Sequence, residues 1–150
     1  MATIKDLLVK KGRHVSSIGP EASALDAALL MNEHKIGSLV VIHNDKVEGI
    51  ITERDILQRV VAARRDPAKC RVADTMTRDV ICCTEVTTLD EARGVMKNRR
   101  IRHLPVVNPR RELLGLISIG DLNAHLATDQ EVTIHFLHEY LYGRAPAESP

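Results

Sequence analysis

Two segments of the chain share one pattern, a hydroxyl side chain followed three positions later by an aspartate. They contain Thr52 with Asp55, and Ser118 with Asp121. One interpretation is a capping box, in which these side chains satisfy the first backbone N–H groups of a helix and no ligand is needed. The other is a binding site, because a carboxylate can accept two O–H donors of a sugar diol and a helix start attracts an anion. The motif alone leaves both open.

The two segments differ in the residues between the hydroxyl and the acid. Apolar Ile119 and slim Gly120 leave room for a ligand to approach the backbone of the second segment. Glu53 and Arg54 take these places in the first segment. Arg54 could bind a phosphate through its planar donors or be a solvated surface side chain, whereas Glu53 would repel a polyphosphate. We therefore expect the better-formed pocket at the second segment, without excluding one at the first.

The densest basic cluster of the chain lies at residues 99–105. Cations favour the C-terminal end of a helix, so a solvated helix end and a phosphate site explain Arg99 and Arg100 equally well. Arg102 and His103 adjoin the strand that follows, where we favour contact with a ligand. Pro105 in that strand is a further candidate for the same site.

The chain contains two copies of one pattern. Ala27 and Ala92 are 65 residues apart, and so are Met31 and Met96. Each copy is expected to form strand, helix, strand, strand and helix, since apolar residues at helical spacing alternate with short apolar runs. The expected elements are residues 15–18, 24–32, 39–42, 47–51 and 55–63, then residues 80–83, 89–97, 104–107, 113–117 and 121–127.

A polar linker with a proline, residues 64–79, joins the copies. Inside it, residues 72–76 resemble residues 4–8, so each repeat is expected to own a short leading segment. A unit of about 60 residues buries proportionally little surface, so we expect both copies to share one core. The expected division is 1–66 for the first repeat, 67–128 for the second, and 129–150 for a C-terminal helix and disordered tail.

The copies differ in charge next to the central strand. Gly37 and Ser38 stand in the first copy where the second has Arg102 and His103. Basic residues that reach across from the second copy would therefore have to serve both pockets.

These features together resemble a tandem pair of CBS domains, a family named after cystathionine β-synthase. The resemblance rests on two copies of a helix ending in Met, a strand such as His-Leu-Pro-Val-Val, and a Gly-hydrophobic-x-Thr/Ser-x-x-Asp motif, over about residues 3–127. The chain is similar to a stand-alone CBS-pair protein of the bacterial type. The resemblance implies an α/β (α+β) fold of two βαββα repeats, packed sheet to sheet as one pseudo-two-fold module, plus the C-terminal helix.

The resemblance also implies roles for the candidate residues. In such pairs the aspartate accepts both ribose hydroxyls of an adenosine ligand, and the Thr or Ser lies near the phosphates. These roles fall on the two hydroxyl–aspartate pairs described above. The first strand of each repeat lines the adenine pocket in related modules, which implies Ile18 and Cys83 as contacts, although core packing is the favoured explanation for either one alone.

The expected function is regulatory and non-catalytic. The module would bind AMP, ADP, ATP or NAD between its repeats, sense energy state and signal to a downstream protein, with no catalytic cofactor. A homodimer is expected, because the wide apolar stripe of the predicted helix 129–142 suits self-association. The alternative is a structural dimerisation module with vestigial nucleotide pockets. An enzyme acting on nucleotides would need an activated water or a metal site, and neither is evident.

Composition excludes several classes of protein. With 21 basic and 20 acidic side chains the net charge is +1, and only 2% of residues are aromatic, so binding of nucleic acid is not expected. No membrane span, secretory signal or disulfide framework is visible, which favours a reducing cytoplasm. His135, His138 and Glu131 make a poor metal site. Adjacent Cys82 and Cys83 would point to opposite faces of a strand, which argues against redox chemistry.

Overall fold

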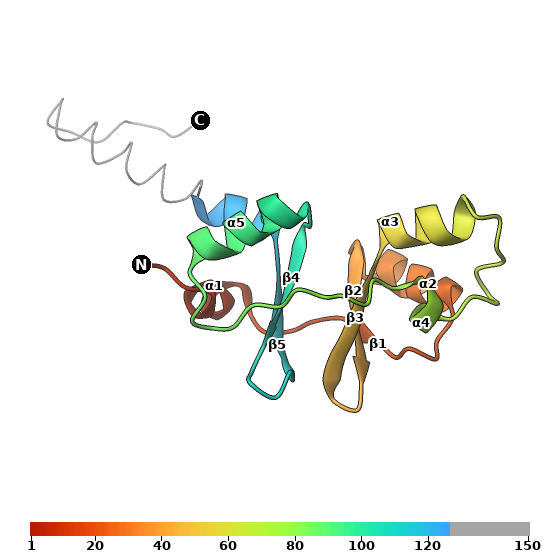
Figure 1. Ribbon diagram of the computed structural model, residues 1–150, viewed down its shortest axis with the longest axis horizontal. Coiled ribbons are helices and arrows are strands. Elements are labelled where there is room, and N and C mark those ends of the chain that lie inside the picture. The colour runs from red at the N-terminus through yellow and green to blue at the C-terminus, as the bar shows by residue number, and fades with distance from the viewer. Residues whose placement is uncertain (127–150) are drawn as a thin grey trace, which may run out of the picture.

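The computed structural model describes residues 1–126, which form two repeats lying side by side (Figure 1). The first repeat contains β1 (Ser17–Ile18), α2 (Ala24–His34), β2 (Ser38–His43), β3 (Lys46–Thr52), α3 (Glu53–Ile56) and the π-helical segment η1 (Leu57–Val61). The second contains α5 (Leu89–Arg99), β4 (His103–Val107), β5 (Leu113–Ser118) and a helix that begins at Ile119. Two leading helices are α1 (Ile4–Lys11) and α4 (Val72–Thr75). The expected mixed α/β class is confirmed.

The two sheets share one pairing pattern. In the first, β1 pairs in parallel with β2, and β2 pairs antiparallel with β3. In the second, β4 pairs antiparallel with β5, and the strand predicted at residues 80–83 is reduced to a parallel bridge between Cys83 and Val106. Each hairpin shifts register once, between Val41 and Ile42 and between Val106 and Val107. The repetition seen in the sequence therefore extends to the bulges of the backbone.

Helices α2 and α5 begin where their cap residues predict. Ser23 and Thr88 accept a hydrogen bond from the third helical N–H, and the acid at that third position accepts from the cap N–H. Both helices end two residues later than predicted, at His34 and Arg99. The C-cap residues that follow, Lys35 and Arg100, adopt the left-handed conformation with φ of 55° and 53°. After α5 this turn leads through Arg100 and Arg102 directly into β4, which begins at His103.

The leading helices are exchanged between the repeats, so the expectation that each repeat owns its leading segment is wrong. Helix α1 packs into the core of the second repeat, where Ile4 and Leu8 are fully buried, and Ile4 N donates to the carbonyl oxygen of Thr87 at 2.8 Å. Helix α4 packs into the first, with Val72 N donating to the carbonyl oxygen of Ala22 at 2.7 Å. Figure 1 shows α1 beside β5 and α4 beside α2. Sequence repetition marks both segments but does not say which core each one joins.

The glycines of the two repeated motifs make room for the exchanged segments. A β-carbon at Gly49 would lie 2.6 Å from the sulfur of Met76 and 2.8 Å from the carbonyl oxygen of Thr77. At Gly115 it would lie 2.7 Å from a terminal methyl of Leu8. Glycine at these strand positions therefore permits the close approach of a neighbouring segment.

The two sheets meet over a shared apolar cluster, built around Val40, Val47 and Val107. The hairpins also touch directly, since Val47 N donates to the carbonyl oxygen of Arg111 at 3.2 Å. This contact confirms the expected sheet-to-sheet packing and places a seam between the repeats.

Residues 127–150 lie outside the described part of the chain. The predicted helix at 129–142, the predicted tail and the weak metal candidates Glu131, His135 and His138 all fall there. Within residues 1–126, no helix is long and apolar enough to cross a membrane. The same residues contain no group of three His, Cys, Asp or Glu side chains that could hold a metal ion.

Candidate functional site

A cavity of about 500 Å³ lies between the repeats, and we call it the inter-repeat cavity. The first repeat contributes the end of β3 and the start of α3, the linker contributes residues near Thr77, and the second repeat contributes residues 100–103. Its volume falls in the range of small-molecule sites, roughly 300–1,000 Å³. Three segments far apart in the chain thus share one concave surface.

Asp55 forms part of the cavity wall and is the only buried charged side chain among residues 1–126. Its Oδ2 accepts from the backbone N–H of Thr52 at 2.9 Å and from the Thr52 hydroxyl at 3.2 Å, while its Oδ1 accepts from the hydroxyl of Thr77 at 3.1 Å. No cation within the described chain forms an ion pair with it. Because each carboxylate oxygen has two lone pairs, Oδ1 can still accept from a ligand.

Thr52 positions this carboxylate through the expected capping box. The Thr52 hydroxyl accepts from the backbone N–H of Asp55 at 3.2 Å, so each residue satisfies the other at the start of α3. The cap occupies Oδ2 of Asp55, Oδ1 accepts from Thr77, and the residue also lines the inter-repeat cavity. The two interpretations of the motif are therefore compatible at this position.

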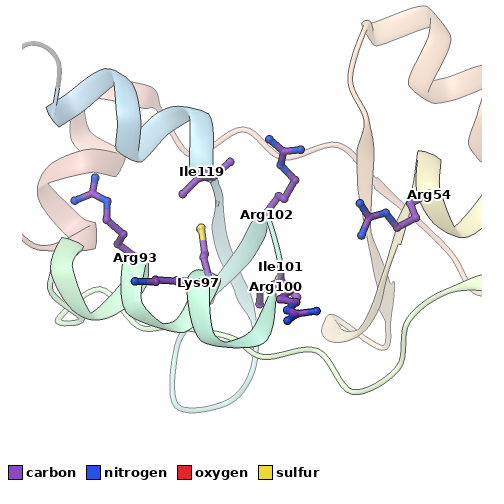
Figure 2. Close-up of a pocket in the computed structure, with 8 residues that line it drawn as sticks. Arg54, Arg93, Lys97, Arg100, Ile101, Arg102 and Ile119 are labelled. Carbon is purple, nitrogen blue, oxygen red and sulfur yellow. The ribbon is translucent and has the colours of Figure 1, made fainter.

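Basic side chains from both repeats line the same cavity. Arg54 and Arg59 come from the first repeat, and Arg100, Arg102 and His103 come from the second. The Arg59 guanidinium is committed to two carbonyl oxygens at the end of α4, at 2.8 and 3.2 Å. In Figure 2, Arg54 extends from the first repeat toward the second repeat, which carries Arg100 and Arg102. Basic residues of the second repeat thus reach the cavity beside Asp55.

His103 begins β4 at the wall of the cavity. Burial holds the pKa of its imidazole below the ordinary 6.5, and the positive charges of Lys11 and Arg102 act in the same direction. The carboxylates of Asp121 and Glu53 act in the opposite direction but do not outweigh them. The ring is therefore neutral near pH 7 and can take up a proton when an anion approaches.

The Asp121 carboxylate is held by a lysine from α1. Lys11 Nζ donates to its Oδ2 at 2.6 Å and to the carbonyl oxygen of Leu116 at 2.5 Å. The same Oδ2 accepts from the N–H of Ser118 at 2.8 Å, and the Ser118 hydroxyl accepts from the N–H of Asp121 at 3.1 Å. The sequence favoured this motif as the better-formed pocket, whereas the structure gives its acid an internal cation and places the inter-repeat cavity beside Asp55.

Burial by itself raises the pKa of the Asp121 carboxyl. The hydrogen bonds from Lys11 and from the N–H of Ser118, together with the charge of Lys11, outweigh burial and hold this pKa below its ordinary value of 3.8. Asp121 is therefore fully ionised at neutral pH. A ligand hydroxyl would have to compete with Lys11 for this carboxylate.

A second cavity, of about 450 Å³, follows α5, and we call it the α5 groove. It shares Arg54, Arg100, Ile101 and Arg102 with the inter-repeat cavity, so the two adjoin. Ile119 from the second motif lines the groove, and Figure 2 shows it facing the space above α5.

Four other candidates lie outside the walls of both cavities. Pro105 is buried in β4, and its carbonyl oxygen accepts from the N–H of Cys83 at 2.9 Å. Cys83 belongs to the core of the second repeat and Ile18 packs against the core of the first. Gly120 is exposed. For Ile18 and Cys83 the structure therefore shows the core packing that the sequence also allowed.

The adjacent cysteines behave as small apolar side chains. Cys82 packs in the cluster between the sheets, whereas Cys83 lies in the core of the second repeat, so they point to opposite sides as predicted. Burial raises the pKa of both thiols, that of Cys83 to about 12. Both are protonated near neutral pH and are poor nucleophiles.

Sequence reasoning missed Thr77, Asp79 and Lys11. Thr77 and Asp79 line the inter-repeat cavity, and Lys11 neutralises Asp121. The resemblance between residues 4–8 and 72–76 was the available signal, because Thr77 directly follows one leading segment and Lys11 ends the helix that contains the other. Only the exchange of these segments shows which acid each one meets.

Comparison with known proteins agrees with this geometry. The family model described as CBS domain matches residues 3–62 and 72–128. The chain is 30% identical over 150 residues to a mitochondrial CBS domain-containing protein of Arabidopsis thaliana, covering 94% of this chain and 72% of that protein. A match to the inosine-5'-monophosphate dehydrogenase of Methanocaldococcus jannaschii, at 35% identity, covers 73% of this chain but only 21% of that enzyme.

Solved structures share the whole arrangement. A CBS-domain containing protein from Agrobacterium tumefaciens is 38% identical with a TM-score of 0.77, covering 83% of this chain and 98% of that one. A candidate signal-transduction protein with CBS domains from Burkholderia ambifaria is 36% identical with a TM-score of 0.81, covering 86% and 96%. With both repeats matched by the family model and the paired fold reproduced, the chain belongs to the CBS domain family, whose tandem pairs are regulatory modules.

Proposed function

We propose that the inter-repeat cavity binds an adenosine-containing ligand of the AMP, ADP, ATP or NAD class and that the module senses energy state without catalysing a reaction. The observation that carries this proposal is the buried Asp55 carboxylate in the wall of a cavity that is also lined by Arg54, Arg100 and Arg102. A carboxylate recognises neutral hydroxyl donors, and arginine recognises phosphate. One cavity thus offers both chemistries that a nucleotide needs.

Each side chain has a distinct role in this proposal. Oδ1 of Asp55 accepts the ribose hydroxyls, and Thr52 holds the carboxylate in place through the cap. Arg54 and Arg102 bind phosphate from opposite repeats, with His103 beside them. The motif of Ser118 and Asp121 is a second, weaker site, which a ligand enters only by displacing Lys11.

A solved relative supports adenosine as the recognised group. The CBS domain pair of protein MJ0100 was crystallised in complex with 5′-methylthioadenosine and S-adenosyl-L-methionine. It is 25% identical to this chain with a TM-score of 0.73, covering 86% of this chain and 98% of that one. Both of those ligands contain an adenosine, although they differ in charge.

Signalling follows if the ligand binds one arrangement of the repeats better than another. A nucleotide in the inter-repeat cavity touches Asp55 from the first repeat and Arg102 from the second, so its contacts depend on the angle between them. Binding then favours the arrangement in which both contacts form. A downstream protein that reads this arrangement receives the signal.

A second candidate function is assembly, which exposed apolar side chains favour. Leu29 on α2 is 58% exposed, and Leu57 and Val61 on η1 are each 61% exposed. Leu57 and Val61 are one helical turn apart, and large exposed apolar side chains that cluster mark interaction surfaces. A hexameric CBS-CP12 protein from cyanobacteria, 29% identical to this chain with a TM-score of 0.71, shows that relatives assemble. We propose a homodimer through this face.

Thermal unfolding with and without millimolar AMP tests the nucleotide proposal. A ligand that binds only the folded state raises the midpoint of unfolding. The rise is expected for the wild type and for Glu33→Ala, a matched loss of an exposed carboxylate on α2, but not for Asp55→Ala. No rise for the wild type would leave assembly as the favoured function. Light scattering tests assembly: the wild type should have twice the chain mass of 16.7 kDa, and Leu57→Ser should have the mass of a single chain.

A further inference from the structure

The α5 groove is lined by basic and apolar side chains and by no carboxylate. Its basic residues are Arg54, Arg93, Lys97, Arg100 and Arg102, and its apolar residues are Met96, Ile101 and Ile119. The inter-repeat cavity differs, because its wall also contains the acidic residues Glu53, Asp55 and Asp79. The α5 groove therefore suits an occupant that is both acidic and apolar.

Four of the five cations that line the groove lack an ion-pair partner in the described chain. Arg93 donates to the carbonyl oxygen of Leu122 at 3.1 Å and has the Asp90 carboxylate 3.9 Å away. Within residues 1–126, no ion pair involves the side chains of the other four. Like charges that line one groove repel one another, so carboxylates placed among them would relieve the repulsion and gain attraction.

The segment that continues the chain, residues 127–150, has the matching composition. Its acidic residues are Asp129, Glu131, Glu139 and Glu148, and its only lysine or arginine is Arg144. The net charge of the segment is therefore −3, and since the whole chain has +1, residues 1–126 carry +4. The segment is also apolar, with Ile134, Leu137 and Leu141 among its residues.

The same segment contains every aromatic side chain of the protein. These are Phe136, Tyr140 and Tyr142, and the chain has no tryptophan. The planar guanidinium of arginine stacks on aromatic faces, and four of the residues that line the groove are arginines. Aromatic character thus adds to charge as a reason for the segment to bind there.

The segment also begins beside the groove. The helix that starts at Ile119 contributes that residue to the groove and extends to Leu126, where the described chain ends. Figure 2 shows Ile119 and Arg93 on neighbouring helices. Leu122, whose carbonyl oxygen accepts from Arg93, lies four residues before Leu126, a rise of only about 6 Å along a helix. Attachment at this short distance raises the effective concentration of the segment at the groove.

We propose that the segment 127–150 docks in the α5 groove of its own chain, with its carboxylates against the groove cations and its apolar side chains against Met96, Ile101 and Ile119. The apolar stripe that the sequence predicts for residues 129–142 is then covered within one chain. Arg54, Arg100 and Arg102 also line the inter-repeat cavity, so the docked segment borders that cavity. Docking does not depend on the binding of a nucleotide.

Tyrosine fluorescence of the full chain tests this inference, because Tyr140 and Tyr142 are its only tyrosines and they belong to the segment. Docked tyrosines are shielded, so acrylamide should quench them more slowly in the native chain than in the chain unfolded in urea. Salt should remove part of this protection, since the Debye length falls from about 10 Å at 0.1 M to about 3 Å at 1 M. Equal quenching in the native and unfolded chains would overturn the proposal.

A charge reversal identifies the groove as the docking site. Lys97→Glu should shift the docking equilibrium about two- to fivefold toward the undocked form, the range for an exposed charge pair, and so speed quenching. Arg99→Glu is the matched control, because Arg99 is an exposed cation on α5 that lines neither cavity, and it should leave quenching unchanged. If the two variants behave alike, the segment does not bind in this groove.

A mixing experiment distinguishes the chain's own groove from that of a second copy. Lys97→Glu, which keeps its tyrosines, is mixed with a chain that carries Tyr140→Phe and Tyr142→Phe and keeps an intact groove. Docking within one chain predicts that the tyrosines of Lys97→Glu stay exposed after mixing. Recovery of their protection would show that the segment binds the groove of another copy, which would overturn the intrachain contact.

Discussion

Asp55 and Asp121 occupy equivalent positions in the two repeats and make equivalent capping bonds, but their surroundings differ. Asp55 is buried and receives a neutral hydroxyl from Thr77, whereas Asp121 is a quarter exposed and receives the ammonium group of Lys11. Lys11 ends one leading helix and Thr77 lies two residues beyond the other. The exchanged segment, and not the motif, therefore determines whether the carboxylate is open to a ligand.

The difference separates two roles of one motif. The hydroxyl and the acid start a helix in both repeats, so the capping role is carried by the motif itself. Recognition of a sugar needs a carboxylate with spare acceptor capacity beside a cavity, and this depends on a residue that lies far away in the sequence. A copy of the motif therefore indicates a helix start by itself. It indicates a ligand site only when the distant residue leaves the carboxylate open.

The largest expected effect is the loss of nucleotide binding when Asp55 is removed. Asp55→Ala should weaken AMP by more than about tenfold, because buried ribose hydroxyls are left unpaired. Asp121→Ala should leave the affinity nearly unchanged, since Lys11 already occupies that carboxylate. Calorimetry on both variants measures the contrast, and 2′-deoxy-AMP should bind the wild type as poorly as AMP binds Asp55→Ala.

Circular dichroism supplies the control, because both variants lose one capping carboxylate and should melt cooperatively. Equal losses of affinity in the two variants would show that the two carboxylates are functionally equivalent and that Lys11 does not keep a ligand from Asp121.

The two motif glycines provide the next contrast, in stability. Gly49→Ala should destabilise the fold by roughly 1–3 kcal/mol, the range for overpacking a well-filled site. The added methyl meets the carbonyl oxygen of Thr77, which is backbone and cannot rotate away. Gly115→Ala should cost less, because its nearest neighbour is a terminal methyl of Leu8 that can turn aside. Urea unfolding measures both, and a larger loss for Gly115→Ala would contradict this packing.

Removing the internal cation should make the second carboxylate resemble the first. Lys11→Met frees Asp121 while keeping an apolar stem, so calorimetry should detect a second, weaker nucleotide site that the wild type lacks. Lys10→Met is the matched control, because Lys10 lies on the same helix and is exposed. Unchanged stoichiometry in Lys11→Met would show that Lys11 does not close this site.

The ion pair between Lys11 and Asp121 should also change how the stability of the fold depends on pH at low pH. The pKa of Asp121 is depressed in the folded state, so its contribution to stability is complete above the ordinary value of 3.8 and is lost as pH falls through the folded value. Wild type should therefore lose more stability below pH 4 than Lys11→Met does, measured by thermal unfolding across pH. Parallel curves for both proteins would argue against the pair.

The smallest expected effect is the pH dependence of nucleotide affinity through His103. Its pKa lies below 6.5 in the free protein, and a phosphate beside the ring favours the protonated form. Binding then takes up a proton, so affinity should rise about two- to threefold as pH falls from 8 toward 6. His103→Gln should remove this part of the pH profile, while protonation of phosphate itself, with a pKa near 6, acts equally on both proteins.

Much of the fold could be predicted from the sequence, because its signals are local. The caps at Ser23 and Thr88 and the apolar spacing behind them define α2 and α5 within two residues. The hairpins followed from apolar runs bounded by turn residues, and the repeat itself from matched spacing. For Arg54 the sequence allowed two roles, a phosphate contact or a solvated surface side chain. In the structure Arg54 is exposed and lines the inter-repeat cavity.

The rest depends on contacts between distant residues. The exchange of α1 and α4 was not predictable, since identical apolar patterns fit either core. The sequence favours the site at Asp121 over that at Asp55, because Ile119 and Gly120 leave room for a ligand and Glu53 would repel a polyphosphate. It gives no sign of Lys11, which lies 110 residues from Asp121 in the chain. The reduced strand at Cys83 was also missed, because apolar character does not fix the number of ladder bonds.

The crossed packing of α1 and α4 has a consequence for any half-length version of this chain. A single repeat would expose the surface that its own leading helix cannot cover, and would complete itself only by lending that helix to another copy. The covalent connection between the halves therefore replaces an association step that would depend on concentration. Severing the chain within residues 62–71 should return that dependence, and the two fragments should regain a cooperative fold only when mixed.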